Sequence, residues 1–277
     1  MRTRTITRWL LVALLLSSGG CAPDSDIRSS RHSATMFTVA SAQYVGSASQ
    51  VKAACTSDAA PDACAVMELF TQAKAKGAML VVAPETVLGQ QYYENDPALG
   101  ENPGENASWA ATSFIKKFSA HAKQEKLYSV IHLATKAGTS KYSTQVAFGP
   151  DGKVVGKHHK FELYSGEAST YLPGNDVMVF DSPIGKVGLM ICADIYGDLA
   201  MHSKLADTHK ARVLAFSTAW TVPGSGNWQA AFAKNWGMYV VGANWDAGSG
   251  VYDPTGKALA QLTTSSSGIA VAQIPAP

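Results

Sequence analysis

Short apolar runs recur along the whole chain, and several of them have no polar face. "AMLVVAPE" at 78–85 and "KVGLMICADI" at 186–195 are apolar at odd and even positions alike. A strand of that kind must be covered on both sides, so these runs predict a layered α/β protein whose helices cover its sheets. Further strands are expected at 36–44, 127–135, 211–220, 238–245, 248–262 and 268–274.

Helices are expected between these strands, where apolar residues recur at intervals of three and four. The segment 65–76 shows this pattern and is ended by Gly77. A hairpin is expected over 143–160, because Pro150, Asp151 and Gly152 are turn residues between two strand-like runs. The remaining helices are expected at 107–126, 199–208 and 228–236.

The first twenty residues are typical of an export signal. Three arginines precede an apolar run of eight residues, Trp9 to Leu16, which is too short to span a bilayer. The segment "SSGGC" follows and resembles the end of a bacterial lipoprotein signal, which would make Cys21 the lipid-bearing first residue. We therefore expect an export signal at 1–20, a flexible tether at 21–35 and one domain at 36–277, anchored to a membrane and facing the periplasm. Ordinary cleavage and a free periplasmic protein are the alternative.

The charge balance gives no support for a nucleic-acid partner. The chain has 23 basic and 21 acidic residues, and the expected signal holds three of the basic residues and none of the acidic ones. A hydrophobic content of 46% with 16% charged residues excludes a disordered chain. No glycine-rich phosphate loop appears, and no histidine or cysteine has companions at metal-ligand spacing. We therefore expect no nucleotide and no metal cofactor.

Four cysteines need an assignment, and one of them, Cys21, belongs to the signal. Cys55 and Cys64 flank the turn-rich segment "TSDAAPDA", so a local disulfide is one possibility in an oxidising compartment and two free thiols are the other. If they pair, Cys192 has no partner. A cysteine in an apolar strand is then either a packing residue or a nucleophile.

Three polar residues follow predicted strands and occur in the order Glu85, Lys160, Cys192, at gaps of 75 and 32 residues. Each alone has a structural interpretation as a capping, solvated or packing residue. His158 and His159 also allow a cysteine–histidine protease, but the chain lacks a papain-like cysteine signature, and paired histidines in a hairpin are expected at the surface.

The three segments together resemble the nitrilase superfamily of carbon–nitrogen hydrolases. "VVAPE" is similar to its glutamate motif, "GKHHKFELY" to its lysine motif and "VGLMICADIYGD" to its cysteine motif. The segment 214–245 looks most like the biotinidase and vanin (pantetheinase) branch. The resemblance covers 37–274 and implies a four-layer α-β-β-α sandwich.

The resemblance also implies roles for individual residues. Cys192 would be the nucleophile, Glu85 the acid–base group and Lys160 the stabiliser of the oxyanion, with the backbone N–H of Ala193 as a second donor. The resemblance further implies that Glu167 orients the lysine, and we expect that Asp194 holds the loop after the nucleophile. We expect Cys192 to react faster than a free thiol. Trp220, Trp228, Trp236 and Trp245 are expected in the core by default, and Trp220, which follows a strand end, could instead line the acyl pocket.

The implied function is hydrolysis of a linear non-peptide amide through a cysteine thioester, without a cofactor, on a pantetheine-like or biotin-amide substrate. Another small-amide or nitrile hydrolase, and a catalytically silent binding lipoprotein, are the alternatives. Vertebrate members of the branch carry a further C-terminal domain, whereas this sequence ends soon after the core, so we expect different pocket walls. A homodimer is also possible.

Overall fold

The computed structural model describes residues 34–46, 55, 60–88, 93–221 and 225–277. The expected export signal, Cys21 and the tether up to residue 33 lie outside the described residues. In the described part of the chain, no helix combines the length and the apolar character needed to cross a membrane.

One sheet joins strands from the amino-terminal half of the chain to its last strand. These strands are β1 (Met36–Gln43), β2 (Ala78–Val82), β3 (Tyr93–Asn95), β4 (Tyr128–Ala137), β5 (Ser140–Phe148), β6 (Val154–His159) and β13 (Gly268–Pro275). The order is β13-β1-β2-β4-β5-β6, and the short β3 also pairs with β4. The central strands β1, β2 and β4 are parallel, and β5, β6 and β13 are antiparallel to their neighbours.

The other sheet comes from the carboxy-terminal half and repeats this plan. Its strands are β7 (Met178–Phe180), β8 (Val187–Ile191), β9 (Val213–Thr218), β10 (Tyr239–Asn244), β11 (Gly250–Tyr252) and β12 (Ala258–Gln261). The order is β12-β11-β10-β9-β8-β7, with β8, β9 and β10 parallel at the centre.

Successive residues of the central strands enter different cores, which explains why these strands are apolar on both faces. On β1, Val39 lies in the core between the two sheets, while Ala40 lies in the core under the helices of the first sheet. On β9, Ala215 lies between the sheets and Leu214 lies under the helices of the second sheet. Because side chains alternate along a strand, each sheet has two buried faces.

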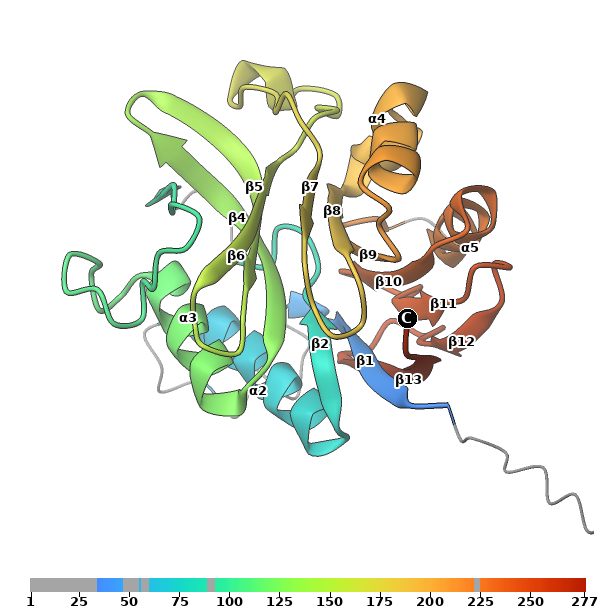
Figure 1. The fold of residues 1–277 in the computed structure, drawn as a ribbon. Coiled ribbons are helices and arrows are strands. Elements are labelled where there is room, and N and C mark those ends of the chain that lie inside the picture. Colours follow the sequence, from blue (N-terminus) through green and yellow to red (C-terminus); the bar gives the residue numbers. More distant parts are fainter. Residues whose placement is uncertain (1–33, 47–54, 56–59, 89–92, 222–224) are drawn as a thin grey trace, which may run out of the picture. The chain divides into compact units, whose positions relative to one another are not determined.

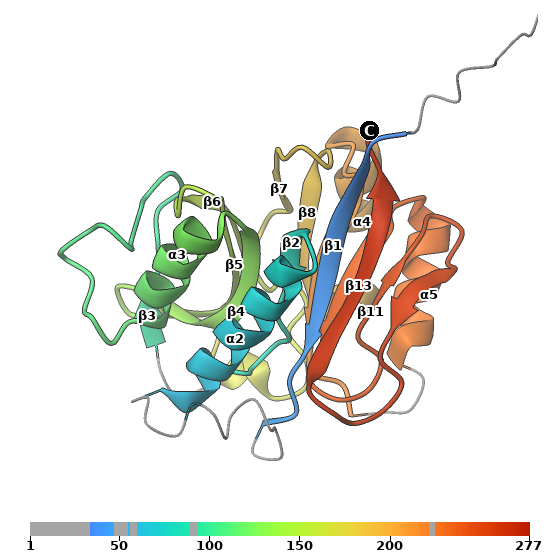
Figure 2. The ribbon, with the colours of Figure 1, turned by 90° about the horizontal axis from the view of Figure 1, so that it is seen from below.

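Helices cover the two outer faces (Figures 1 and 2). α2 (Pro61–Ala75) and α3 (Phe114–Glu125) pack on the first sheet. α4 (Leu199–Ser203), continued by a π-helical turn at Lys204–Thr208, and α5 (Ser225–Trp236) cover the second sheet. The predicted four-layer α-β-β-α sandwich is confirmed.

Three helices begin at other residues than expected, and the helix expected at 228–236 begins at Ser225. The helix expected at 107–126 begins at Phe114, because the Ser113 hydroxyl caps it by accepting a hydrogen bond from the Lys116 N–H at 3.1 Å. The helix expected at 65–76 begins at Pro61, a residue that the first turn of a helix tolerates. The strands β3 and β7 were not predicted, since three residues are too few to show an alternating pattern.

Cys55 and Cys64 are joined by a disulfide bond in the structure. Cys64 lies in the first turn of α2, and Cys55 is buried against the same core. Cys192 is the free cysteine within the described residues.

Candidate active site

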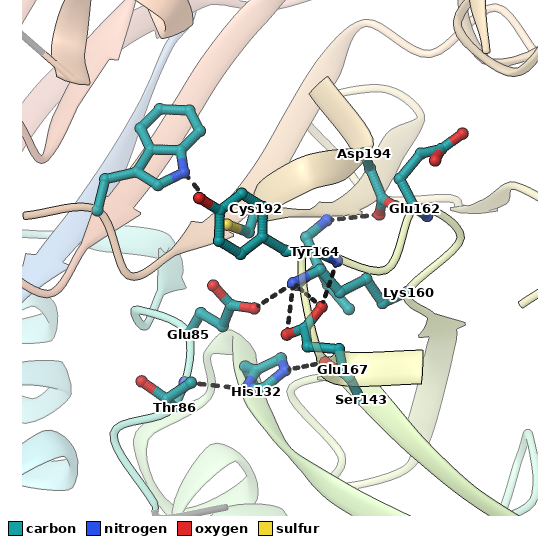
Figure 3. Close-up of polar contacts among 12 residues, drawn as sticks. Glu85, Thr86, His132, Ser143, Lys160, Glu162, Tyr164, Glu167, Cys192 and Asp194 are labelled. Carbon is teal, nitrogen blue, oxygen red and sulfur yellow. Dashed lines mark hydrogen bonds and ion pairs between the residues drawn. The ribbon is translucent and has the colours of Figure 1, made fainter. Parts of the chain in front are cut away.

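A pocket of about 480 Å³ opens where strands of both sheets end, and it brings the three motif residues together. Glu85 follows β2 and Lys160 follows β6 in the first sheet, whereas Cys192 follows β8 in the second. Figure 3 shows their side chains pointing toward one another. The site therefore exists only where the two sheets face each other.

Lys160 is at the centre of the charged cluster. Its ammonium group donates hydrogen bonds to Glu85 at 2.8 Å and to Glu167 at 2.9 Å, and its side chain is only 1% exposed (Figure 3). Burial by itself lowers a lysine pKa, but the ion pairs with Glu85 and Glu167 outweigh it and hold the pKa of Lys160 above its ordinary value. Lys160 is therefore a fixed positive charge in the pocket.

Cys192 begins the 3₁₀-helix Cys192–Tyr196 with a φ of 41°, a conformation that is uncommon for a residue other than glycine. Its sulfur atom accepts a hydrogen bond from the indole N–H of Trp220 at 3.1 Å. Burial and the nearby charge of Glu85 raise the pKa of the Cys192 thiol to about 12. The expectation of a thiol more reactive than a free one is thus not supported by the resting state, in which the sulfur keeps its proton.

Glu85 is the group that can remove this proton. The Cys192 thiol donates a hydrogen bond to its carboxylate, and the Glu85 side chain is buried. Burial raises the pKa of Glu85 above that of a free glutamate, while Lys160 and the thiol favour the carboxylate form and partly oppose this increase. A carboxyl group with a raised pKa is a stronger base, which suits proton transfer from sulfur.

Two further predicted residues line the same pocket. Glu167, in the 3₁₀-helix Glu167–Ser169, binds Lys160 and also accepts a hydrogen bond from the Tyr164 N–H at 2.7 Å. Ala193 lies in the first turn after the nucleophile, where a backbone N–H has no partner within the helix. Ala193 therefore forms part of the pocket wall directly beside the nucleophile.

Asp194 links the cysteine segment to the lysine segment. One carboxylate oxygen accepts hydrogen bonds from the N–H groups of Phe161 and Glu162, at 2.9 and 2.8 Å. The other accepts from the Ile191 N–H at 2.9 Å and contacts His158 Nε2 at 2.8 Å. The buried Asp194 thus fixes the backbone on both sides of the pocket.

The expectation that both paired histidines lie at the surface is wrong for His158. Side chains alternate along β6, so His158 points into the buried side, where Asp194 binds it, and His159 points to the half-exposed side. His158 contacts Asp194 and no contact with Cys192 is recorded for it in the described structure, so a cysteine–histidine pair is not formed.

His132 on β4 is a site residue that the sequence analysis missed. Its Nδ1 accepts a hydrogen bond from the N–H of Thr86 at 3.0 Å, and its Nε2 lies 2.8 Å from the Ser143 hydroxyl (Figure 3). Burial, with a smaller effect from the positive charge of Lys160, lowers the pKa of His132 to about 3, so the ring is neutral. Thr86 has a φ of 63° and directly follows Glu85, so the neutral ring holds the Glu85 loop in an unusual conformation.

Aromatic side chains surround the mouth of the pocket. Trp220 lines it, as do Tyr164, Tyr196 and Trp245. The expectation of core tryptophans is wrong for Trp228 and Trp245, which are 51% and 42% exposed, whereas Trp236 is half-buried. Trp228 lies in the first turn of α5, and Trp245 directly follows the end of β10.

Within the described part of the chain, no group of three or more histidine, cysteine or acidic residues is arranged to hold a metal ion. The site instead offers a thiol, a base hydrogen-bonded to it, a fixed cation and a backbone donor. These are the groups that nucleophilic attack on an amide carbonyl requires.

Residues 38–277 match the model of the carbon–nitrogen hydrolase family. The chain belongs to this family. Its similarity to pantetheinases and to biotinidase confirms the resemblance described above. The chain is 28% identical to pantetheinase of Mus musculus over 67% of its own length and 43% of the relative's.

Other relatives divide between two kinds of enzyme. Biotinidase of Rattus norvegicus is 30% identical over 52% of this chain and 32% of the relative. Omega-amidase of Xenopus tropicalis is 32% identical over 50% of this chain and 51% of the relative. The chain thus spans about half or less of the length of these relatives.

The fold is shared with a solved amidase from Nesterenkonia sp. AN1. One structure of this amidase, a cysteine-to-alanine mutant in complex with butyramide, matches with a TM-score of 0.67 at 19% identity. The match covers 86% of this chain and 91% of the amidase. At this identity, the comparison shows the fold alone.

Proposed function

We propose that this chain hydrolyses the carbon–nitrogen bond of small, linear, non-peptide amides through a thioester on Cys192. The observation that carries the proposal is the hydrogen-bonded series Cys192–Glu85–Lys160–Glu167 in one pocket. In this series the protonated nucleophile is hydrogen-bonded to its base, and the ammonium group of Lys160 lies beside them.

In the first half of the reaction, the thiol proton moves to Glu85 as the sulfur attacks the carbonyl carbon. The carbonyl electron pair moves to oxygen, and the oxyanion is stabilised by Lys160 and the N–H of Ala193. One such donor is worth about 3 kcal/mol of transition-state stabilisation. The carbon–nitrogen bond then breaks, and the leaving amine takes the proton from Glu85.

In the second half, Glu85 removes a proton from water, which attacks the thioester. The carbon–sulfur bond breaks, the carboxylic acid leaves, and the thiol regains its proton from Glu85. The same carboxyl group thus acts as base and acid in each half, a role suited to a group with a raised pKa.

The similarity to pantetheinase and biotinidase supports pantetheine-like or biotin-amide compounds as the substrate, and the similarity to omega-amidase supports simpler primary amides. Purified protein should therefore be assayed with pantetheine, biocytin and simple aliphatic amides. Intact-mass measurement on a quenched reaction should show the protein plus one acyl group.

Two variants test the residue roles. Cys192→Ala should abolish both turnover and the acyl adduct while the circular dichroism spectrum stays unchanged, and Glu85→Gln should lower kcat by at least about a hundredfold, the lower range of acid–base catalysis. Turnover that survives in Cys192→Ala would disprove the mechanism. Binding of these amides without turnover by the unmodified protein would instead identify a catalytically silent binding protein.

A further inference from the structure

Charged groups in the pocket are few and mostly negative. Among the described residues that line it, Glu85, Glu167 and Lys160 are the charged ones. With both glutamates ionised, as the mechanism requires for Glu85, two carboxylates face one ammonium group. The ammonium already donates to both of them, so no free cation remains there for a substrate carboxylate.

The other described residues of the pocket wall are neutral. Thr86, Ala219 and Thr221 complete the wall with small neutral side chains.

Aromatic side chains also line the pocket. Tyr164, Tyr196, Trp220 and Trp245, which we call the aromatic wall, all line it. Tyr164 is 68% and Tyr196 is 51% exposed, and exposed aromatic side chains gathered around a cavity are typical of a binding surface. The wall is also ordered: the ring of Tyr196 lies 5.8 Å from Trp220 and meets Trp228 edge-on at 4.8 Å.

We propose that the pocket takes amides whose acyl chain carries no negative charge, and that the aromatic wall binds an apolar or planar part of that chain. The inference rests on the proposed amide hydrolysis and narrows its substrate class. It separates this site from one that takes amides of dicarboxylic acids, whose free carboxylate needs a cation.

The reason is electrostatic. A carboxylate placed in the pocket would lose water and meet a net negative charge, and at a separation of several ångströms this repulsion amounts to about tenfold or more in affinity. A neutral amide or alkyl group of the same size meets no such repulsion, and a flat group gains contact with the aromatic rings.

Adipamide and adipamic acid test this inference, because they differ only in a terminal amide against a terminal carboxylate. We expect kcat/KM to be at least about tenfold higher for adipamide, after a factor of two for its two reactive ends, with a smaller difference at high salt. Calorimetric titration of the Cys192→Ala protein should show the same preference in binding.

The two measurements separate the possible failures. Preferred binding of adipamide without any turnover by the unmodified protein would contradict the proposed hydrolysis and leave the charge selection standing. Turnover with equal kcat/KM for both compounds would overturn the charge selection and leave the hydrolysis standing. Failure of Cys192→Ala to bind adipamide more tightly than adipamic acid would also overturn it.

A matched pair of variants tests the effect of the pocket's charge. Thr221→Lys places a cation on the pocket wall and should reduce the preference for adipamide by at least about fivefold, whereas the neutral Thr221→Gln of similar length should keep it within twofold. Equal behaviour of the two variants would show that charge does not set the preference.

A second pair tests the aromatic wall. Tyr196→Ala should reduce the ratio of kcat/KM for 3-phenylpropionamide over that for propionamide by about fivefold or more. A contact between two aromatic rings contributes binding free energy of that size. Leu259→Ala, which removes an exposed apolar side chain of β12 that does not line the pocket, should leave the ratio unchanged. An unchanged ratio in Tyr196→Ala would exclude the wall as the binding surface.

Discussion

The Nε2 atom of His158 lies 2.8 Å from Oδ2 of Asp194, and both side chains are buried. His158 belongs to β6, two residues before the lysine, and Asp194 lies two residues after the cysteine. This contact joins the ends of the two sheets directly behind the pocket. The distance between the fixed cation and the nucleophile therefore depends on a pair of residues that do not touch substrate.

Replacing Asp194 by asparagine should damage both stability and catalysis. An asparagine has one acceptor oxygen, so part of the buried set of donors from Ile191, Phe161, Glu162 and His158 would lose its partner. We expect the free energy of unfolding in urea to fall by about 3 kcal/mol. Asp181→Asn, at an exposed ion pair, is the control and should change it by less than about 0.5 kcal/mol. Equal stabilities of the two variants would contradict this role.

His132 should act as a positioning residue for Glu85. His132→Ala leaves the Thr86 N–H without its acceptor and releases the loop that carries Glu85, so kcat should fall by about tenfold to a hundredfold while KM changes little. His132→Asn keeps an acceptor near the position of Nδ1 and should recover much of kcat. An alanine variant that changes KM alone, or an asparagine variant no better than alanine, would argue against positioning.

The decrease of kcat/KM on the acid side of the pH profile should occur at a higher pH than the ionisation of a free glutamate would give. Protonation of Glu85 removes the base, and burial raises its pKa above the ordinary glutamate value, so activity should be lost at a higher pH than for a free glutamate. As the pH falls through that pKa, the rate should decrease about tenfold per unit. Because the Cys192 thiol has a pKa of about 12, no second rise from thiolate formation should appear between pH 7 and 9. A rise near pH 8.5 would indicate an ordinary free thiol.

The cysteines should separate into a bonded pair and a free nucleophile. After unfolding without reductant and alkylation, peptide mapping should find Cys55 linked to Cys64 and label on Cys192. The free energy of unfolding of the double variant Cys55→Ser/Cys64→Ser should be about 2–3 kcal/mol lower than that of the unmodified protein. This is the value that the chain-entropy model gives for so short a loop. A disulfide that includes Cys192 in active protein would contradict its assignment as nucleophile.

The proposed lipid anchor can be tested independently of the fold. Labelled palmitate supplied to cells that express the full sequence should enter the unmodified protein and not Cys21→Ser. Label in both proteins would place the lipid elsewhere, and label in neither would favour cleavage without an anchor.

Sequence reasoning was sufficient for the layered fold, because strands apolar on both faces have few ways to be buried. It also selected Glu85, Lys160 and Cys192, whose segments keep a recognisable order along the chain. The structure has these three side chains in one pocket.

Other features of the site could not be predicted, because they depend on contacts between distant segments. His132 is one polar residue in an apolar strand, and its partners Thr86 and Ser143 come from separate parts of the chain. The direction of the Cys192 pKa shift depends on burial and on a carboxylate more than a hundred positions away. Exposure of Trp228 and Trp245 follows from their place at element ends and not from residue type.

The division of the pocket between two sheets has a consequence for fragments of the molecule. Glu85, Lys160 and Glu167 all precede β7, and Cys192 and Trp220 follow it. A chain cut between Glu167 and β7 would give one piece with Glu85, Lys160 and Glu167 and another with the sulfur, and neither could cleave an amide alone. The second piece would also carry β13, the edge strand of the first sheet, so hydrolysis regained on mixing would measure how well the two pieces rebuild that sheet and close the pocket between the sheets.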